Sequence, residues 1–399
     1  MKRLSSETLA FIHAHWGDDV RALALQAKKY PEVDMLEAAV QIAGRQVAER
    51  KIPSWAKVES VRYPSHLSME QCSSELTARY KASLINGETF ADLTGGLGVD
   101  CSFISQRFRK ADYVERQNSL CELAIHNFAA LGLRHIHVHC ADGVSYLSQM
   151  TPVDCLFLDP ARRDSYGSKT VAISDCEPDI GILEPVLVEK GRKVMIKLSP
   201  MLDIAKALQV LKHITQIHIV AVHNECKELI ILLEKSVEKS DYIGSEVCIY
   251  CKQIVDNLLI PPFVFTLSEE RNAMCEYADK VETYLYEPGV TLLKAGAYRL
   301  LALRYGVKKL HPNSHLYTSD HQVDFPGRQF QVEAVSGFGK KELKTLLGGV
   351  EKANLTVRNF PTSVTELRKK LKLKEGGEIY LFATTLKDEE RVLIKCSKI

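Results

Sequence analysis

The sequence predicts an α/β protein whose largest part is a mostly parallel sheet with helices on its faces. Seven short apolar runs alternate with helical stretches between residues 88 and 234, which is typical of such a sheet. The runs cover residues 90–93, 113–115, 136–138, 155–158, 193–197, 217–222 and 229–233. Only residues 223–228 separate the last two runs, which is too short for a helical crossover. The seventh strand should therefore run antiparallel to the sixth, in a Rossmann-like, seven-stranded arrangement.

The chain is too long for one ordinary domain, and its pattern of apolar residues changes near residue 85 and at two places farther along. Apolar residues recur at spacings of three and four near the N-terminus, as at Leu36 and Val40, which predicts helices. Pro261 and Pro262 mark one boundary, and a second break falls near Pro326. The expected parts are an N-terminal helical region (1–85), the sheet domain (86–260) and two small α+β domains (261–326 and 327–399).

The composition excludes several classes of protein. No apolar run approaches the roughly 20 residues that a membrane span needs, and the first residues lack the apolar core of a secretory signal. Eleven cysteines are scattered singly, which fits a reducing compartment. Cys248 and Cys251 have metal-ligand spacing, but no second such pair accompanies them. We expect a soluble, cytoplasmic protein that requires no metal and binds no membrane.

A glycine-rich turn follows the first predicted strand. Asp92 leads into Thr94-Gly95-Gly96-Leu97-Gly98, and a helical stretch comes next. Glycines here let the backbone approach a ligand and aim the amides of the helix N-terminus at it. The dinucleotide pattern Gly-x-Gly-x-x-Gly is absent, and a carboxylate at Asp92 would repel a pyrophosphate but attract an ammonium group. The turn therefore predicts a ligand that carries an amine.

Acidic residues follow each of the next three strands. Glu115 comes about 17 residues after Gly98, close to the spacing at which a carboxylate accepts hydrogen bonds from ribose hydroxyls. Asp142 follows the third strand, where it could meet an adenine amino group, and Asp159 follows the fourth. Ligands bind at these strand ends in parallel sheets. The alternative is that the glycines only make a tight turn and that each acid caps the next helix.

On these residues, the segment 88–234 resembles the seven-stranded class I fold of S-adenosylmethionine-dependent methyltransferases. The resemblance implies such an enzyme (EC 2.1.1 class) with S-adenosylmethionine as its cofactor. It also implies roles for particular residues: Asp92, Thr94, Gly95, Gly96 and Gly98 at the methionine end, Glu115 with Arg116 at the ribose, and Asp142 with Gly143 at the adenine. Threonine at the first glycine position of the loop departs from the usual pattern, as it does in many RNA-modifying members.

The reaction loop is expected at Asp159-Pro160-Ala161-Arg162. Family members that methylate exocyclic amines carry Asp-Pro-Pro-Tyr here, and the acid and backbone carbonyls accept the amine hydrogens. Alanine and arginine replace the second proline and the aromatic residue. Methylation of uracil at carbon five is an alternative, but it needs a cysteine nucleophile, for which Cys226 is a weak candidate. We expect Asp159 and Pro160 to position the acceptor, and Arg162 either to bind substrate or to form a solvated salt bridge.

The C-terminal part carries an excess of basic residues, which could contact phosphates or could mark only a solvated helix face. It resembles the THUMP-like domain that follows a ferredoxin-like segment in a bacterial group of inferred methyltransferases, typified in Bacteroidetes. The resemblance implies RNA modification, with a base of tRNA or rRNA as the target, delivered by the C-terminal domain. Two alternatives remain open: methylation of a protein or small molecule, and a cofactor-sensing RNA-binding protein without turnover.

Overall fold

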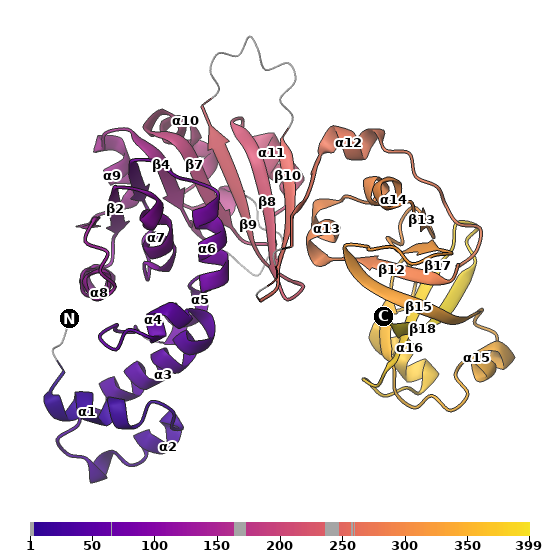
Figure 1. Ribbon diagram of the computed structural model, residues 1–399, viewed down its shortest axis with the longest axis horizontal. Coiled ribbons are helices and arrows are strands. Elements are labelled where there is room, and N and C mark those ends of the chain that lie inside the picture. Colours follow the sequence, from indigo (N-terminus) through magenta and orange to yellow (C-terminus); the bar gives the residue numbers. More distant parts are fainter. Residues whose placement is uncertain (1–3, 65, 163–172, 236–246, 257, 259) are drawn as a thin grey trace. The chain divides into compact units, whose positions relative to one another are not determined.

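The computed structural model describes residues 4–64, 66–162, 173–235, 247–256, 258 and 260–399, without the side chains of residues 66–68 and 162 (Figure 1). The chain forms two compact units. The first comprises Met1–Ile217 with Glu228–Ser245, and the second comprises His218–Lys227 with Glu246–Ile399. No helix in the described part of the chain is both long and apolar enough to span a membrane.

The first unit begins with helices, as the spacing of apolar residues predicted. Polar side chains cap several of them, and Asp34, for example, accepts a hydrogen bond from the backbone of Glu37 at the start of α3. Phe11, Ile12 and Ile42 pack together in their core. The helices are α1 (Ser6–Ala14), α2 (Val20–Ala24), η1 (Ala27–Lys29), α3 (Met35–Lys51), α4 (Pro53–Ala56), α5 (His66–Gln71) and α6 (Glu75–Ser83).

The larger sheet contains all seven expected strands. They are β1 (Thr89–Asp92), β2 (Lys110–Glu115), β3 (Ile136–Cys140), β4 (Val153–Leu158), β7 (Gly191–Leu198), β8 (Ile214–Val222) and β9 (Glu225–Glu234). Strand β1 pairs in parallel with β2 and β4, and β7 pairs in parallel with β4. Strand β9 lies between β7 and β8 and runs antiparallel to β7. This confirms the expected methyltransferase-like sheet, with the last strand inserted in the reverse direction.

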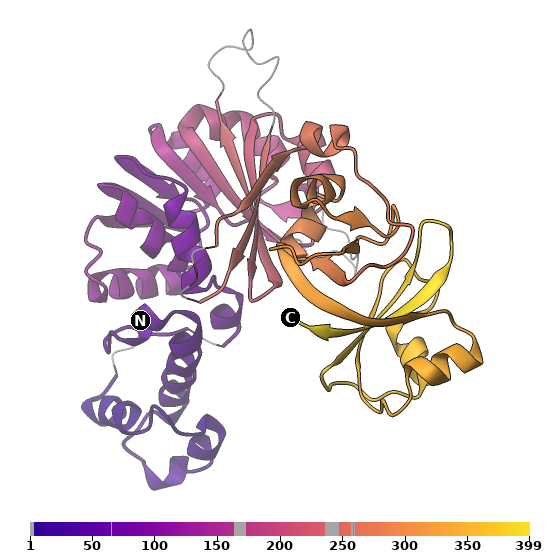
Figure 2. The ribbon, with the colours of Figure 1, turned by 45° about the vertical axis from the view of Figure 1, so that its right-hand side comes forward.

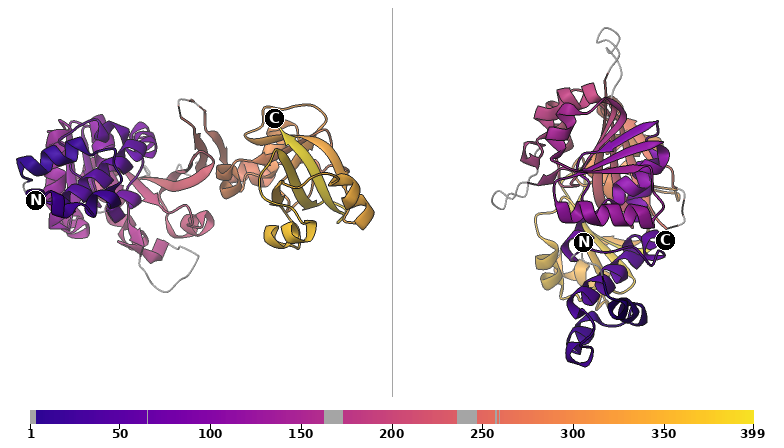
Figure 3. Two further views of the ribbon diagram at one scale, coloured as in Figure 1. Left: turned by 90° about the horizontal axis from the view of Figure 1, so that it is seen from below. Right: turned by 90° about the vertical axis from the view of Figure 1, so that its left-hand side faces the viewer.

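Helices follow the strands and flank the sheet (Figure 2 and Figure 3). They are α7 (Val99–Ile104), η2 (Ser105–Arg107), α8 (Asn118–Ala130), α9 (Gly143–Gln149), α10 (Ile180–Lys190) and α11 (Ile204–Val210). Strand residues such as Phe90, Leu156 and Ile196 are fully buried under them. Because the strands are covered on both faces, they read as continuous apolar runs in the sequence.

Strand β8 crosses from the first unit into the second. His223 and Asn224 form the two-residue turn to β9, and both have the positive φ that tight hairpin turns use. Beyond β8 the sheet continues with β10 (Cys248–Ile254) and β11 (Phe263–Thr266), which gives nine strands in place of the seven expected. The sequence analysis missed these two because the alternation of apolar runs weakens after β9.

The second unit contains a further seven-stranded sheet in the order β13-β14-β12-β15-β18-β17-β16. Leu285 and Phe382 pack on one face of this sheet, and Leu367 and Leu381 pack on the other. The strands are β12 (Tyr284–Pro288), β13 (Lys308–Lys309), β14 (Tyr317–Ser319), β15 (Gly327–Ser336), β16 (Asn354–Val357), β17 (Ile379–Thr385) and β18 (Arg391–Lys398). The helices are α12 (Leu267–Asn272), α13 (Val290–Ala295), α14 (Arg299–Tyr305), α15 (Lys340–Leu346) and α16 (Val364–Leu371).

Candidate active site

A cavity of about 460 Å³ lies at the carboxyl ends of β1 to β4. A short antiparallel ribbon also contributes to the cavity wall. It consists of β5 (Ala161–Arg162) and β6 (Cys176–Glu177), and η3 (Ile173–Asp175) comes directly before β6. Predicted site residues that line it are Thr94, Glu115, Arg116, Asp142, Gly143 and Asp159. Asp92, Gly95, Gly96, Gly98 and Pro160 are not among the lining residues, and the side chain of Arg162 lies outside the described part of the structure.

The glycines of the turn after β1 are required by their neighbours. A Cβ atom on Gly95 would lie 2.3 Å from the ring of Tyr113, and one on Gly98 would lie 2.8 Å from the ring of Phe128. Gly98 also has a φ of +82°, which a residue with a side chain rarely adopts. The hydroxyl of Tyr113 donates a hydrogen bond to the carbonyl of Gly96 at 2.5 Å. The turn is therefore held tightly against β2 and α8.

A second close approach fixes the opposite wall of the cavity. A Cβ atom on Gly143 would lie 2.2 Å from the carbonyl oxygen of Leu93, so only glycine lets α9 begin at this point. Asp142 precedes it and accepts a hydrogen bond from the backbone N–H of Ser145 at 2.9 Å. This hydrogen bond lowers the pKa of Asp142. Asp142 thus caps α9, as the alternative interpretation expected, and also borders the cavity.

Glu115 joins β2 to the glycine turn. Its carboxylate accepts hydrogen bonds from the backbone N–H of Gly96 at 2.9 Å and from that of Gln117 at 2.8 Å. The residue is largely buried but borders the cavity. A carboxylate has about four acceptor positions, so two remain for a ligand. Arg116 beside it forms an ion pair with Glu177 across the cavity wall, at 3.3 Å.

Asp92 lies under the turn and is 1% exposed. One of its oxygens accepts a hydrogen bond from the backbone N–H of Thr94 at 3.0 Å. Burial raises the pKa of Asp92, and the negative charges of Asp100, Asp159 and Glu115 raise it further. So many carboxylates near one another favour a cationic ligand.

Asp159 is fixed by two neighbours at the end of β4. Its backbone N–H donates a hydrogen bond to the hydroxyl of Thr94 at 2.6 Å, which ties the reaction loop to the glycine turn. Nζ of Lys197, at the end of β7, lies 2.6 Å from its Oδ2 atom. Lys197 was not singled out from the sequence. A lysine that closes a run of buried apolar residues could have signalled this ion pair.

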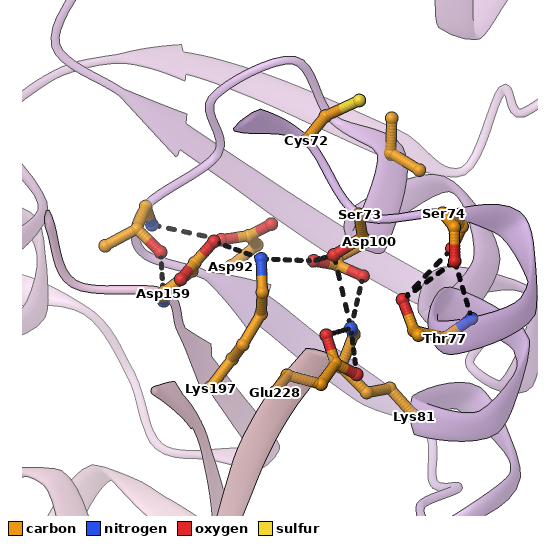
Figure 4. Close-up of polar contacts among 12 residues, drawn as sticks. Cys72, Ser73, Ser74, Thr77, Lys81, Asp92, Asp100, Asp159, Lys197 and Glu228 are labelled. Atoms are coloured by element: carbon orange, nitrogen blue, oxygen red, sulfur yellow. Dashed lines mark hydrogen bonds and ion pairs between the residues drawn. The ribbon is translucent and has the colours of Figure 1, made fainter. Parts of the chain in front are cut away.

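Behind this pair lies a buried cluster of charges that the sequence analysis did not foresee (Figure 4). Asp100 at the start of α7 lies 3.1 Å from Nζ of Lys81 in α6 and accepts a hydrogen bond from the hydroxyl of Ser73 at 2.7 Å. Lys81 also forms an ion pair with Glu228 of β9 at 2.7 Å. Ser74 caps α6, as the N–H of Thr77 donates to its hydroxyl. Ser73 and Ser74 are therefore both engaged by other groups of the protein.

Family models match the C-terminal part of the chain, and comparisons over most or all of its length find methyltransferases. Residues 284–326 match the model of a ferredoxin-like domain, and residues 327–398 match that of a THUMP domain-like family. An uncharacterized S-adenosylmethionine-dependent methyltransferase of Mycobacterium tuberculosis is 22% identical over 330 residues, which cover 80% of this chain and 83% of that one. A crystal structure from Porphyromonas gingivalis W83, solved as a candidate methyltransferase, is 35% identical with a TM-score of 0.86 and covers 100% of both chains.

The chain belongs to the S-adenosylmethionine-dependent methyltransferases. The methyltransferase therefore takes S-adenosylmethionine as its methyl donor, as the glycine turn and the acids at the strand ends indicated. The cavity fits this molecule in size, because ligand pockets usually have volumes of roughly 300 to 1,000 Å³. Its acidic surroundings fit the positive sulfonium and ammonium groups.

Proposed function

We propose that the methyltransferase transfers its methyl group to RNA, with tRNA or rRNA as the natural target. The observation that carries the proposal is the THUMP-like match of residues 327–398, combined with the charge of that segment. From residue 327 onward the chain has 15 lysines and arginines against nine acidic residues, whereas the rest of the chain is slightly acidic. Such a local excess of positive charge favours contact with phosphates.

Eight lysines of this segment lie in α15, in α16 or in the turns after these helices. Helices α15 and α16 contribute to the same apolar cluster on one face of the second sheet, through Leu346 and Leu367. Their lysines lie away from that cluster and are exposed. The exposed lysines of these helices and the turns after them are Lys340, Lys341, Lys344, Lys352, Lys369, Lys370, Lys372 and Lys374. A group of exposed positive charges is suited to bind a polyanion.

Within the cavity we propose that the predicted residues hold the cofactor. The two free acceptor positions of Glu115 would receive the ribose hydroxyls, and Arg116 would close that side. Asp142 and Gly143 would border the adenine. Asp92, Thr94, Gly95, Gly96 and Gly98 would form the part that faces the methionine end, where an ammonium group would offset the burial and the neighbouring carboxylates that raise the pKa of Asp92.

The acceptor would enter beside the reaction loop. When bound, S-adenosylmethionine supplies a methyl group on a sulfonium, and the protein has to align the acceptor and exclude water. Asp159 borders the cavity and is held in place by Thr94, while Pro160 is buried and stiffens the loop. Arg162 follows them and is proposed to bind the substrate. That the methyl acceptor is an atom of a base remains a prediction from the sequence.

The location of the protein stays an expectation as well. All eleven cysteines are free thiols. Free thiols persist in a reducing compartment, which agrees with the cytoplasm. Fractionation of cells with an antibody against the protein checks this.

An RNA-binding measurement tests the proposal. The wild-type protein should bind total RNA with an affinity that falls steeply with salt. A variant in which Lys369, Lys370, Lys372 and Lys374 are changed to glutamine should bind about tenfold or more weakly, with a smaller salt dependence. The control changes four exposed lysines of the first unit, Lys28, Lys29, Lys57 and Lys212, to glutamine. Equal binding by both variants, or no binding by the wild type, would contradict the proposal.

A further inference from the structure

A lysine lies beside the reaction loop, where the sequence analysis placed no cation except Arg162. Nζ of Lys197 lies 2.6 Å from Oδ2 of Asp159 and 3.7 Å from Oδ2 of Asp100 (Figure 4). The side chain of Asp159 is 38% exposed and borders the cavity, whereas that of Lys197 is only 13% exposed. A methyl acceptor that reaches Asp159 therefore meets a carboxylate with an ammonium group fixed next to it.

The surrounding charges keep this ammonium group protonated and in place. Burial alone would lower the pKa of Lys197, but the negative charges of Asp159, Asp100 and Glu228 outweigh it and raise the pKa above its ordinary value. Asp100 is held in turn by Lys81 at 3.1 Å. At neutral pH the ammonium group of Lys197 therefore donates hydrogen bonds and has no lone pair with which to accept one. Its position is fixed by Asp100, which Lys81 holds in turn.

This pair does not suit an exocyclic amine. The amino group of a base has two hydrogens to donate and needs its nitrogen lone pair for the attack on the methyl carbon, so it requires two acceptors. Lys197 can accept no hydrogen bond, so the pair supplies only one of these acceptors, and the second would have to be a backbone carbonyl of the reaction loop. The replacement of the usual proline and aromatic residue by Ala161 and Arg162 agrees with this mismatch.

A hydroxyl group matches the pair. It has one hydrogen, which the second oxygen of Asp159 can accept, and two lone pairs. One lone pair can receive a hydrogen bond from Lys197, and the other remains free for the methyl carbon. Both side chains would thus orient the oxygen for in-line attack.

We propose that Asp159 and Lys197 select a hydroxyl as the methyl acceptor. This inference rests on the proposed RNA substrate, in which the acceptor is then the 2′-hydroxyl of a ribose. The hydroxyl oxygen forms a bond to the methyl carbon, and the bond between carbon and sulfur breaks with its electron pair going to sulfur. The hydroxyl proton passes to Asp159 and from there to water. Lys197 orients the oxygen and holds the carboxylate of Asp159 in place.

Analysis of the product tests this assignment. RNA from a host that lacks the gene is incubated with the protein and S-adenosylmethionine labelled in the methyl group, and then hydrolysed with alkali. Alkali cleaves RNA through each 2′-oxygen, so a nucleotide methylated there stays joined to its neighbour. We expect the label in dinucleotides. Label in mononucleotides would overturn the hydroxyl assignment but keep RNA as substrate, whereas label in protein alone would overturn both.

A pair of variants tests the role of Lys197. Lys197→Met should lower kcat by about 100-fold, the size usual when a reacting atom is no longer held in position, and should leave the affinity for S-adenosylhomocysteine within about threefold. Lys197→Arg, which keeps the charge, should recover part of the rate. The control is Lys193→Met in the same strand, where Lys193 pairs with Glu234 at 3.4 Å and not with the reaction loop. Equal rates for Lys197→Met and Lys193→Met would overturn the role of Lys197.

Discussion

At the scale of single residues, the geometry of the cofactor loop depends on glycines that touch other parts of the backbone or aromatic rings. Gly95 and Gly98 lie against the buried rings of Tyr113 in β2 and Phe128 in α8, and a Cβ atom at either position would come closer than 3 Å to a ring atom. Gly143 differs, because the atom it would meet is the backbone carbonyl oxygen of Leu93. Backbone atoms cannot yield without moving a strand or a helix.

Gly143→Ala should therefore weaken cofactor binding more than it changes folding. The added methyl group pushes the start of α9 away from the loop after β1 and opens the cavity, so the affinity for S-adenosylhomocysteine should fall by about tenfold or more. Isothermal titration calorimetry measures this. Gly17→Ala is the control, since nothing lies within 4 Å of a Cβ atom there. An unchanged affinity in Gly143→Ala would contradict the described geometry.

At the scale of elements, buried charges connect α6, α7 and β9 behind the reaction loop. Lys81 is 0% exposed and neutralises both Asp100 and Glu228. Burial raises the pKa of Glu228, an effect that Lys81 and Lys197 offset only in part, whereas for Asp100 the two lysines outweigh burial and lower the pKa. The two acids therefore depend on the lysines for their charge.

Lys81→Met should destabilise the first unit by about 3 to 5 kcal/mol, because it leaves two buried carboxylates without their nearest cation. The double variant Lys81→Met, Glu228→Gln should recover part of that loss. Arg79→Met on the exposed side of the same helix breaks an ion pair with Glu75 and should cost less than about 1 kcal/mol. Urea denaturation provides the free energies of unfolding. If Lys81→Met and Arg79→Met had equal free energies of unfolding, the structural role of Lys81 would be refuted.

Local patterns predicted part of this site, and long-range contacts explain the rest. Glu115, Asp142 and Asp159 border the cavity, and they were predicted there because each lies at or just after a strand end, and the position of parallel strand ends is a property of the fold. The pairing of Lys197 with Asp159 joins positions that are 38 residues apart, and that of Lys81 with Glu228 joins positions 147 apart. No spacing rule connects such residues. Strands β10 and β11 were missed for a similar reason, since their pattern alone does not show which sheet they join.

At the scale of the whole molecule, the second unit contains buried histidines that make its stability depend on pH. His218 is 1% exposed and stacks on Tyr250 with ring centroids 4.4 Å apart. Burial lowers its pKa to about 4. The pKa of His315 is also lowered to about 4, by burial and by the charges of Lys309 and Arg358.

Stability of the second unit should fall as the pH drops from about 6.5 towards 4. In this window the unfolded chain takes up protons on these histidines and the folded chain does not, so protonation favours unfolding. Between pH 7.5 and pH 5, His218 alone should account for roughly 2 kcal/mol. Thermal unfolding of wild type and His218→Gln at both pH values checks this. The variant should lose less stability between the two values than the wild type, and an equal loss would contradict the assignment.

The measurement that tests the central claim most directly is methyl transfer into fractionated material from a host that lacks the gene. The wild-type protein, with S-adenosylmethionine labelled in its methyl group, should label the RNA fraction. Glu115→Ala and Asp92→Ala, which remove carboxylates from the proposed cofactor site, should label it at least about tenfold less. Label that enters protein or small molecules while RNA stays unlabelled would contradict the RNA assignment. Undiminished labelling by both variants would contradict the proposed cofactor site.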